Sequence, residues 1–463
     1  MLFNSYAFLC VFLPAVVAGF FLLPRQGLRV AFLVIASYVF YAYAQWWFPA
    51  LMIGSTAISF TTGRLLVAER NRSRRKLVLG IGVAGALALL LYFKYTQFAA
   101  GELSSFVNVI TGRGLPSLKA FTAGILLPVG ISFYTFEAIS YMVDVYRGDV
   151  EVERNPLRYA FFISFFPHLI AGPIVRYGKL APQLRRFYRF DPDLMLSGLV
   201  LFSLGLVKKV VLADQIAART DALLGQPGQL GLATSWAAMI GYAFQIYLDF
   251  AGYTDMALGL ARMFGIELPW NFDRPYRAAS PREFWRRWHV TLSTWLRDYL
   301  YIPLGGNRKG PRRRDANLLA TMGLGGLWHG ASLSFVFWGL WHGLLLLVQH
   351  HLERLPIRLP RPLAVAVTFV LVTVGWVFFR MRSPGPIADV LTAMAGGNGI
   401  GASPERLLLV LIGVAAVLMW CVPEEWHWNL GRFGFWRLVP IGIATALAIL
   451  LLNDTQRFIY FQF

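Results

Sequence analysis

Long apolar segments recur along almost the whole chain, and they constrain the possible fold more than any other feature. The first 24 residues contain no charged side chain. A helix needs about 20 mostly apolar residues to cross the hydrocarbon core of a bilayer. The sequence therefore predicts an all-α integral membrane protein, with about eleven transmembrane helices in a single polytopic domain. The expected spans are 3–24, 28–45, 47–67, 77–98, 120–146, 194–212, 234–260, 318–348, 363–379, 407–422 and 438–452 of the domain 1–463.

Two apolar segments depart from the pattern of a simple span. Residues 159–177 are short and are interrupted by prolines and a glycine, which predicts a re-entrant or strongly kinked segment. Residues 318–348 form either one long tilted helix or two helices that break at Gly330. The two cysteines, Cys10 and Cys421, lie in apolar runs, so we expect buried thiols and no disulfide framework.

The distribution of basic residues predicts the orientation in the membrane. The chain has 43 Lys and Arg against 24 Asp and Glu, and 57% of it is hydrophobic. A net charge of +19 is compatible with nucleic-acid binding, but so much uninterrupted apolar sequence is not. Lys and Arg gather in cytoplasmic loops of membrane proteins. The basic loops at 64–76 and 147–158 are therefore expected inside, which places the N-terminus outside.

The segment 281–300 is the most distinctive part of the chain outside the predicted spans. Ser280 and Glu283 have the spacing of a capping box, and Pro281 suits the first helical turn. Helical periodicity puts aromatic residues on one face and arginines on the other, which predicts an amphipathic helix in the membrane interface. His289 falls between these faces. The segment either grips anionic lipid or forms the floor of a site that offers arginines to an anionic donor.

His329 is the strongest candidate for chemistry. It lies between glycines in the apolar sequence GGLWHGAS (325–332). Ionisable residues within a membrane are costly and are functional candidates by default. An imidazole can take a proton from a hydroxyl group, although a histidine packed against a helix carbonyl is an equally good interpretation of these residues alone. His342 and His168 are expected to be structural, and His342 would face away from His329 on a continuous helix.

Other polar residues in apolar segments are expected to form structural ion pairs rather than a catalytic pair of carboxylates. The residues assigned to this intramembrane group are Asp144, Lys208, Asp249 and Asp255. The sequence has no Walker loop, no dinucleotide-binding glycine pattern and no Cys/His cluster with metal spacing. We therefore expect no metal site and no bound cofactor.

Seven stretches in combination resemble the membrane-bound O-acyltransferase (MBOAT) family, and most closely its bacterial branch for polysaccharide O-acetylation, of which alginate acetylation is the type. They are LPVGISFYTFEAISYMVDVYRG (127–148), FFPHLIAGPIVRY (165–177), GLVKKVVLAD (205–214), YLDFAGYTDMALGLARMFGIELPWNF (247–272), SPREFWRRWHVTLSTWLRDYLYIPLGGNR (280–308), GGLWHGAS (325–332) and FIYFQF (458–463).

The resemblance implies a catalytic function for two histidines. His329 matches the family histidine that acts as the base, and His289 matches a second position that is His or Asn. The implied reaction moves an acetyl group from a thioester to a hydroxyl. Acetyl-CoA or the thioester of an acidic acyl-carrier protein is the expected donor. Candidate donor-binding residues are Trp285, Arg286, Trp288, Arg297, Trp328 and Ser332.

The resemblance also implies a place in the cell and a set of partners. We expect a multi-pass protein of the bacterial inner membrane that contacts membrane lipid and does not bind nucleic acid. A periplasmic SGNH-type O-acetyltransferase or a polysaccharide export complex would then receive the acetyl group. Cellulose, peptidoglycan and D-alanylated teichoic acid remain alternative acceptors. A proton-coupled transporter and a structural scaffold for an export complex are the alternatives from other classes.

Overall fold

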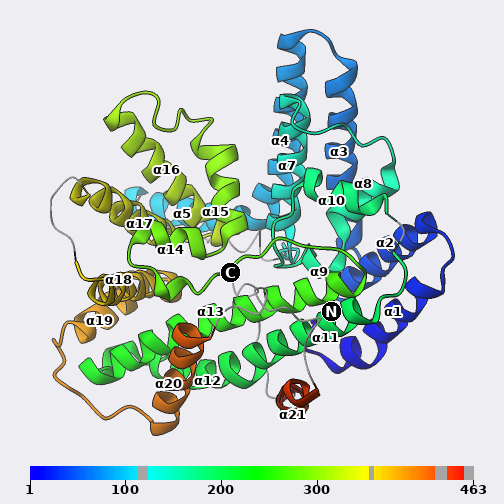
Figure 1. Ribbon diagram of the computed structural model, residues 1–463. Coiled ribbons are helices and arrows are strands. Elements are labelled where there is room, and N and C mark those ends of the chain that lie inside the picture. Colours follow the sequence, from blue (N-terminus) through cyan, green and yellow to red (C-terminus); the bar gives the residue numbers. More distant parts are fainter. Residues whose placement is uncertain (112–121, 123, 187, 354–358, 423–434, 453–463) are drawn as a thin grey trace. The chain divides into compact units, whose positions relative to one another are not determined.

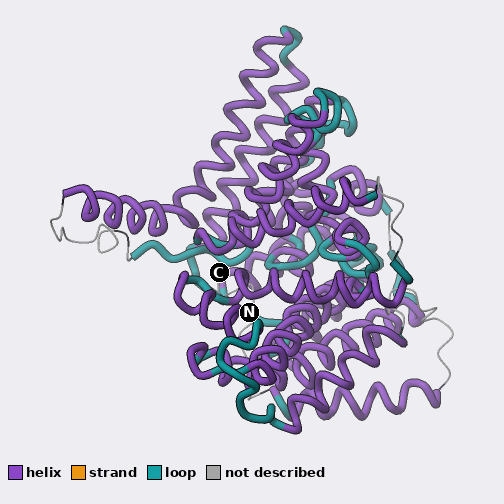
Figure 2. Tube along the Cα trace, turned by 90° about the vertical axis from the view of Figure 1, so that its left-hand side faces the viewer, coloured by secondary structure: helices purple, strands orange, loops and turns teal. Residues whose placement is uncertain are grey.

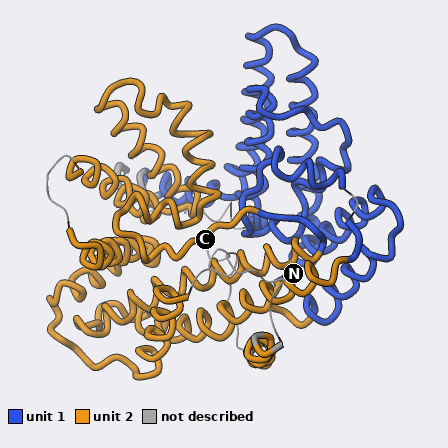
Figure 3. The backbone as a smooth tube through the Cα atoms, viewed as in Figure 1, with its two compact units in different colours: residues 1–2, 7–190, 264–268 blue, residues 3–6, 191–263, 269–463 orange. Residues whose placement is uncertain are grey.

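The computed structural model consists of helices joined by loops, with no strand among the residues it describes (Figure 2). It describes residues 1–463 apart from 112–121, 123, 187, 354–358, 423–434 and 453–463, so the motif at 458–463 lies outside the described part. The predicted all-α fold class is confirmed. The predicted polytopic domain contains two compact units (Figure 3). Unit 1 comprises 1–2, 7–190 and 264–268, and unit 2 comprises 3–6, 191–263 and 269–463.

Unit 1 is built around a group of long apolar helices in which α3, α4 and α7 pack side by side (Figure 1). Asn71 caps the start of α4 by accepting hydrogen bonds from Ser73 N and Arg74 N. The helices are η1 (Ala7–Phe12), α1 (Leu13–Leu22), α2 (Gln26–Ala42), α3 (Phe48–Ala68), α4 (Arg72–Leu90), η2 (Leu91–Tyr95), α5 (Thr96–Thr111), α7 (Ile131–Arg147), α8 (Pro156–Ser164), α9 (Phe166–Leu169) and α10 (Tyr177–Leu184).

The segment 159–177 is broken, as its prolines predicted. The helix α8 ends at Ser164, the four-residue α9 follows, and residues 170–176 have no helical structure. The carboxylate of Glu137 on α7 accepts a hydrogen bond from Val175 N (2.9 Å) and lies 3.5 Å from His168 Nε2. The bond to Val175 N and the proximity of His168 thus tie the irregular backbone to α7, which agrees with a structural role for His168.

Unit 2 has the long helix α13 at its centre, with α11 and α12 packed along it (Figure 1). The helices α16 and α17 form a second closely packed pair. The helices are α11 (Pro192–Val207), η3 (Lys208–Ala213), α12 (Asp214–Leu224), η4 (Pro227–Gln229), α13 (Leu232–Met263), η5 (Pro275–Arg277), α14 (Pro281–Arg287), α15 (Val290–Leu296), η6 (Arg297–Tyr301), α16 (Pro311–His329), α17 (Leu333–Leu352), α18 (Arg361–Arg380), α19 (Pro384–Met394), α20 (Arg406–Cys421) and α21 (Phe435–Leu450).

Several helices are long and apolar enough to cross a membrane, as a multi-pass membrane protein requires. In the described part of the chain five meet this condition by length and composition, namely Phe48–Ala68, Arg72–Ser104, Pro192–Leu224, Leu333–Leu352 and Arg361–Arg380. Shorter apolar helices are Ala7–Leu22, Gln26–Ala42, Arg406–Cys421 and Leu438–Leu450. The count of about eleven spans stays a prediction.

The structure decides between the two interpretations of residues 318–348. The helix α16 ends at His329, Gly330 is extended, and Ser332 caps the start of α17. The segment therefore forms two helices, which are separated at Gly330. The expectation that His342 faces away from His329 assumed a continuous helix, so it no longer applies.

The polar residues of α13 form ion pairs with the π-helical segment η3, as expected. Lys209 Nζ lies 2.6 Å from Asp214 Oδ1 and 2.7 Å from Asp249 Oδ1, and Lys208 Nζ lies 2.9 Å from Asp255 Oδ2. All of these side chains are buried or nearly so. The removal of one partner would leave a buried charge uncompensated, so these pairs stabilise the contact between η3 and α13.

Two further expectations about single residues can be compared with the structure. Asp144 is buried on α7, as an intramembrane polar residue should be. Cys10 and Cys421, however, are both exposed, so the expectation of buried thiols was wrong. Apolar runs on membrane helices face lipid as well as the protein interior, and sequence alone does not separate the two faces.

Candidate active site

The segment 281–300 is not one amphipathic helix, which corrects the sequence prediction. The helix α14 ends at Arg287, and His289 adopts φ 42° and ψ 56° before α15 begins at Val290. A non-glycine residue in this left-handed region is uncommon and needs support from its surroundings. The change of direction brings Trp288 and His289 into the protein interior, where they are 1% and 0% exposed.

Asn271 supplies the support for this turn. It is fully buried, and its Oδ1 accepts hydrogen bonds from Thr291 N (3.2 Å) and Thr291 Oγ1 (2.6 Å). Its backbone carbonyl accepts from Val290 N (3.0 Å). The first N–H groups of α15 are therefore satisfied by a residue outside that helix, which fixes the position of His289. Sequence analysis missed Asn271, although it lies in a stretch that carried the family resemblance.

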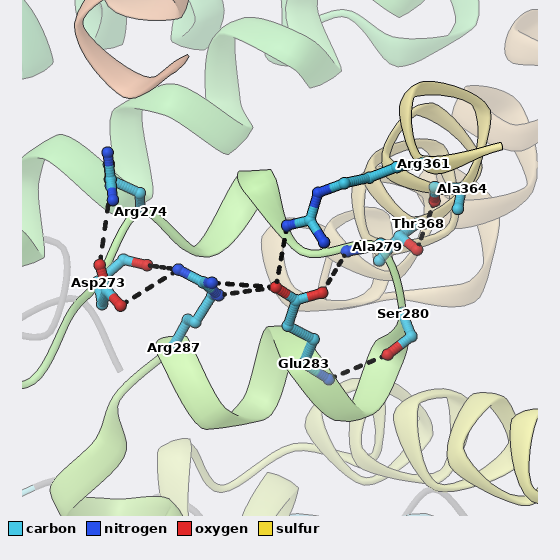
Figure 4. A network of polar contacts seen from close by, with 9 residues as sticks. All are labelled: Asp273, Arg274, Ala279, Ser280, Glu283, Arg287, Arg361, Ala364 and Thr368. Atoms are coloured by element: carbon cyan, nitrogen blue, oxygen red, sulfur yellow. Dashed lines mark hydrogen bonds and ion pairs between the residues drawn. The ribbon is translucent and has the colours of Figure 1, made fainter. Parts of the chain in front are cut away.

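The start of α14 is capped by the predicted Ser280–Glu283 pair, although Glu283 reaches the N–H of Ala279 rather than that of Ser280. Ser280 Oγ accepts from Glu283 N (3.2 Å), and Glu283 Oε2 accepts from Ala279 N (2.8 Å) (Figure 4). The other carboxylate oxygen of Glu283 lies 3.0 Å from Arg287 Nη2 and 3.5 Å from Arg361 Nη2. Partial burial acts to raise the pKa of Glu283, but these N–H and guanidinium groups hold it below its usual value.

Arg287 extends the same network to the loop before α14. Its Nη1 donates to the carbonyl oxygen and to Oδ2 of Asp273, both at 3.1 Å (Figure 4). Asp273 N in turn donates to Arg287 O (3.0 Å). Both ends of α14 are thus fixed, so the turn at His289 is held from the N-terminal side as well as by Asn271.

His329 is the last residue of α16 and is placed by close packing of that helix on α17. A Cβ atom at Gly326 would lie 2.0 Å from Phe335 O, and one at Gly339 would lie 2.1 Å from Met322 O. Side chains are therefore excluded at both positions, and the two backbones touch. Since Gly326 is one turn before His329, this contact sets the place of the imidazole.

The two histidines that the sequence singled out lie together. Their ring centroids are 6.5 Å apart, and His329 is 4% exposed. Phe250 packs edge-on against His289 at 4.8 Å, while Trp328 and Trp338 each lie 5.0 Å from His329. Burial lowers the pKa of His289 to about 3, so this imidazole is neutral at physiological pH.

A cavity of about 970 Å³ lies in the same unit, beside α14 and α15. Its volume suits a sizeable organic ligand. Five of its lining residues are basic or can become so, and no Asp or Glu lines it. These residues are Arg282, Arg286, Arg297, Arg314 and His350. Met322 also lines the cavity and precedes His329 by two turns of α16, a rise of about 10 Å.

The structure places three of the six predicted donor-binding residues on this cavity, namely Trp285, Arg286 and Arg297. The other three lie elsewhere. Trp288 is buried, and Trp328 packs beside both histidines, with its ring 6.2 Å from that of His289 and 5.0 Å from that of His329. Ser332 caps α17 by accepting a hydrogen bond from Ser334 N (3.3 Å).

His342 is closer to the site than the sequence suggested. Its ring lies 5.0 Å from that of Trp338 and 5.2 Å from that of Trp285. Both of its ring nitrogens, together with Nε1 of these two tryptophans, are buried without a hydrogen-bond partner among the described residues. Buried polar groups normally have partners. This cluster extends from the cavity, which Trp285 lines, to His329, which Trp338 contacts.

The fold and the site define a helical protein with several apolar helices of membrane-spanning length and two buried histidines near a cavity lined by basic side chains. Residues 152–381 match the model of the MBOAT, membrane-bound O-acyltransferase family. The probable alginate O-acetylase AlgI of Pseudomonas putida is 43% identical over 403 residues, which are 85% of this chain and 80% of the relative. The chain therefore belongs to the MBOAT family, and the resemblance inferred from its motifs is confirmed.

Two further relatives support the same class. The probable alginate O-acetylase AlgI of Pseudomonas aeruginosa is 44% identical over 83% of this chain and 72% of its own length. The peptidoglycan O-acetyltransferase of Helicobacter pylori is 36% identical over 86% of this chain and 81% of its own length. The family and the names of these relatives confirm the predicted class of enzyme, an O-acetyltransferase.

Proposed function

We propose that this protein transfers acetyl groups for the O-acetylation of an extracytoplasmic polysaccharide of the alginate type. The observation that carries the proposal is the 6.5 Å separation of the His289 and His329 rings in the protein interior. A hydroxyl and a thioester carbonyl placed there could each reach one imidazole nitrogen at hydrogen-bond distance, roughly 2.6–3.2 Å. The names of the two Pseudomonas relatives support alginate as the acceptor.

In the proposed reaction, His329 accepts the proton of the acceptor hydroxyl while the hydroxyl oxygen bonds to the thioester carbonyl carbon. The C–S bond then breaks, and the thiolate takes the proton from the imidazolium, so the products are an ester and a thiol. The C-terminus of α16 carries a partial negative charge, which stabilises the transient positive charge on His329. His289, which is neutral, donates its N–H to the carbonyl oxygen as negative charge develops there.

The cavity beside α14 is the proposed entry for the donor. Arg286, which forms no ion pair among the described residues, suits a phosphate of acetyl-CoA, or the phosphate that links the acyl-carrying arm to an acidic carrier protein. The other three arginines of the cavity are paired with carboxylates of the protein and add positive charge around it only in part. The amide groups of that arm would supply hydrogen-bond partners for the buried nitrogens of Trp285, Trp338 and His342. The buried ring nitrogens of these three side chains would thus find hydrogen-bond partners when the donor is bound.

The membrane arrangement is part of the proposal. With its basic loops in the cytoplasm, the protein would be a multi-pass component of the bacterial inner membrane with its N-terminus outside. The acetyl group would leave on the outer side, to a periplasmic SGNH-type O-acetyltransferase or an export complex. The acidic carrier, if it is the donor, would approach from the cytoplasm.

The test compares His329→Ala with His351→Ala in cells that lack the native gene. His351 lies on the same unit with its side chain 57% exposed, so it is a matched control for the loss of an imidazole. We expect His329→Ala to lower polymer-bound acetyl, measured by NMR, by roughly a hundredfold or more at equal protein level. Secreted polymer should stay constant. Normal acetylation in His329→Ala would refute the assignment, and loss of the polymer itself would favour the transporter interpretation.

Peptidoglycan is the second candidate acceptor, because the Helicobacter pylori relative covers 86% of this chain. The same cells distinguish the two acceptors. O-acetyl groups that disappear from peptidoglycan, while those on the secreted polysaccharide remain, would move the assignment to peptidoglycan.

A further inference from the structure

Unit 1 contains a second cavity, of about 800 Å³, that the proposed reaction does not use. It is formed by the end of α3, the start of α4, the end of α7 and the loop that follows α7. Four arginines line it, namely Arg70, Arg75, Arg154 and Arg185. These residues belong to or adjoin the basic loops expected on the cytoplasmic side.

Two of the three glutamates at this cavity are occupied by the protein itself. One oxygen of Glu153 accepts from the hydroxyl of Tyr177, and the other accepts from Arg154 N (2.8 Å) and Asn155 N (2.7 Å). Glu69 accepts from Asn71 N (2.8 Å) and lies 3.9 Å from Arg74, which does not line the cavity. Only Glu151, which is exposed, is left to oppose the arginines.

The arginines of the cavity, by contrast, are not neutralised by acidic side chains of the described residues. Arg70, Arg154 and Arg185 form no ion pair with any other described residue. Arg75 is held in place, because its Nη2 donates to Tyr146 O (3.1 Å) and its guanidinium lies 5.3 Å from the Tyr146 ring centroid. Its Nε is buried and has no hydrogen-bond partner among the described residues. Arg75 is therefore a pre-positioned positive charge in the wall of the cavity, and such a charge suits an anionic ligand.

Apart from the arginines and glutamates, the residues of the cavity wall are apolar. Val67, Val145 and Val150 lie among the arginines, and Val67 is 54% exposed. We propose that this cavity binds a phosphate-bearing anion, and that the anion is the head group of an acidic membrane lipid. An acidic lipid matches both kinds of surface, since its phosphate suits arginine and its chains suit valine. A free phosphate compound would suit the arginines but not the valines.

The experiment uses the full-length protein in detergent and measures retained phosphatidylglycerol by native mass spectrometry. Arg70→Gln with Arg185→Gln removes two charges from the cavity. Arg72→Gln with Lys76→Gln is the matched control, because it removes two exposed charges from the adjacent helix start that neither line the cavity nor pair with its glutamates. We expect the cavity variant to retain roughly tenfold less lipid than wild type. The control should retain lipid within about twofold of wild type. Val67→Trp fills the cavity without a change of charge and should also lower retention.

Inorganic phosphate serves as the second probe. If it raises the melting temperature of wild type but not of the cavity variant, while lipid retention is equal in both, the phosphate-binding site is supported and the ligand is a soluble phosphate compound. Equal losses of lipid in both double variants would refute the site, because basic loops then act only by their general charge. Unchanged lipid retention and unchanged phosphate stabilisation in the cavity variant would refute it as well.

Discussion

The carboxamide oxygen of Asn271 accepts hydrogen bonds from both the backbone N–H and the hydroxyl of Thr291, two residues after the left-handed His289. Asn271 is thus a positioning residue for His289. We expect Asn271→Ala to lower the rate of acetyl transfer by about tenfold or more, because a small displacement of a catalytic group is costly. The KM for the donor should change little, since Asn271 does not line the cavity. The rate is measured in membranes at matched protein level.

Asn271→Asp is the control, because it keeps an oxygen acceptor in the same place. We expect it to retain much more activity than Asn271→Ala. If both variants are equally impaired, or if Asn271→Ala is fully active, the hydrogen bonds to Thr291 do not position His289.

The buried, neutral state of His289 predicts a dependence of stability on pH. The pKa of His289 is about 3 in the folded protein, against about 6.5 in an unfolded chain. Because the unfolded chain binds a proton first, this stabilising contribution is complete above about pH 6.5 and is lost as the pH falls toward 3. Between pH 7.5 and 5 the loss is about 2 kcal/mol. His289→Asn should lose less stability than wild type over this interval. Thermal unfolding in detergent measures the difference, and equal losses would contradict the burial of a neutral imidazole.

The arginines of the donor cavity should act on binding rather than on the chemical step. We expect Arg286→Gln to raise the KM for the donor by roughly tenfold with little change in kcat, because a charge-assisted hydrogen bond to phosphate is lost. Arg312→Gln removes an exposed charge nearby that does not line the cavity, and it should leave KM unchanged. Steady-state kinetics with acetyl-CoA distinguish the two. Equal effects of the two substitutions would argue for general attraction only.

The contact between α16 and α17 predicts a severe effect of a single methyl group. In Gly326→Ala the added carbon would lie 2.0 Å from Phe335 O, so the helices must separate. We expect a loss of about 3 kcal/mol or more and little folded protein. Gly413→Ala is the control, since a Cβ there has no neighbour within 4 Å among the described residues. Size-exclusion profiles and melting temperatures show the difference. A stable, active Gly326→Ala protein would disprove the close contact.

Local signals in the sequence were reliable where short-range chemistry decides the structure. Ser280 and Glu283 cap the start of α14 as their spacing predicted, with the return bond shifted to Ala279 N, and the break at Gly330 was one of two interpretations considered. The proximity of His289 and His329 agrees with the roles that the family resemblance gave them. Both residues stand in motifs whose residue types were visible without the structure.

The turn at His289 was not predictable from local pattern. The helical period of the aromatic residues continues through Trp288, so a single helix was the natural reading of the segment. The hydrogen bonds that break it come from Asn271, outside the periodic segment, and a period carries no information about such partners. The same limit explains His342, whose direction was judged along a continuous helix that in fact ends at His329.

The backbone contact at Gly326 and Gly339 has a consequence for engineering. His329 is held by main-chain atoms rather than by the side chains of the cavity wall. Residues such as Leu346 and Leu347 can therefore be exchanged for smaller or larger ones to accept a different acyl chain, while the base stays in register. In a redesign of acyl selectivity, the backbone contact at Gly326 and Gly339 is the part to keep, and the side chains that line the cavity are the part to vary.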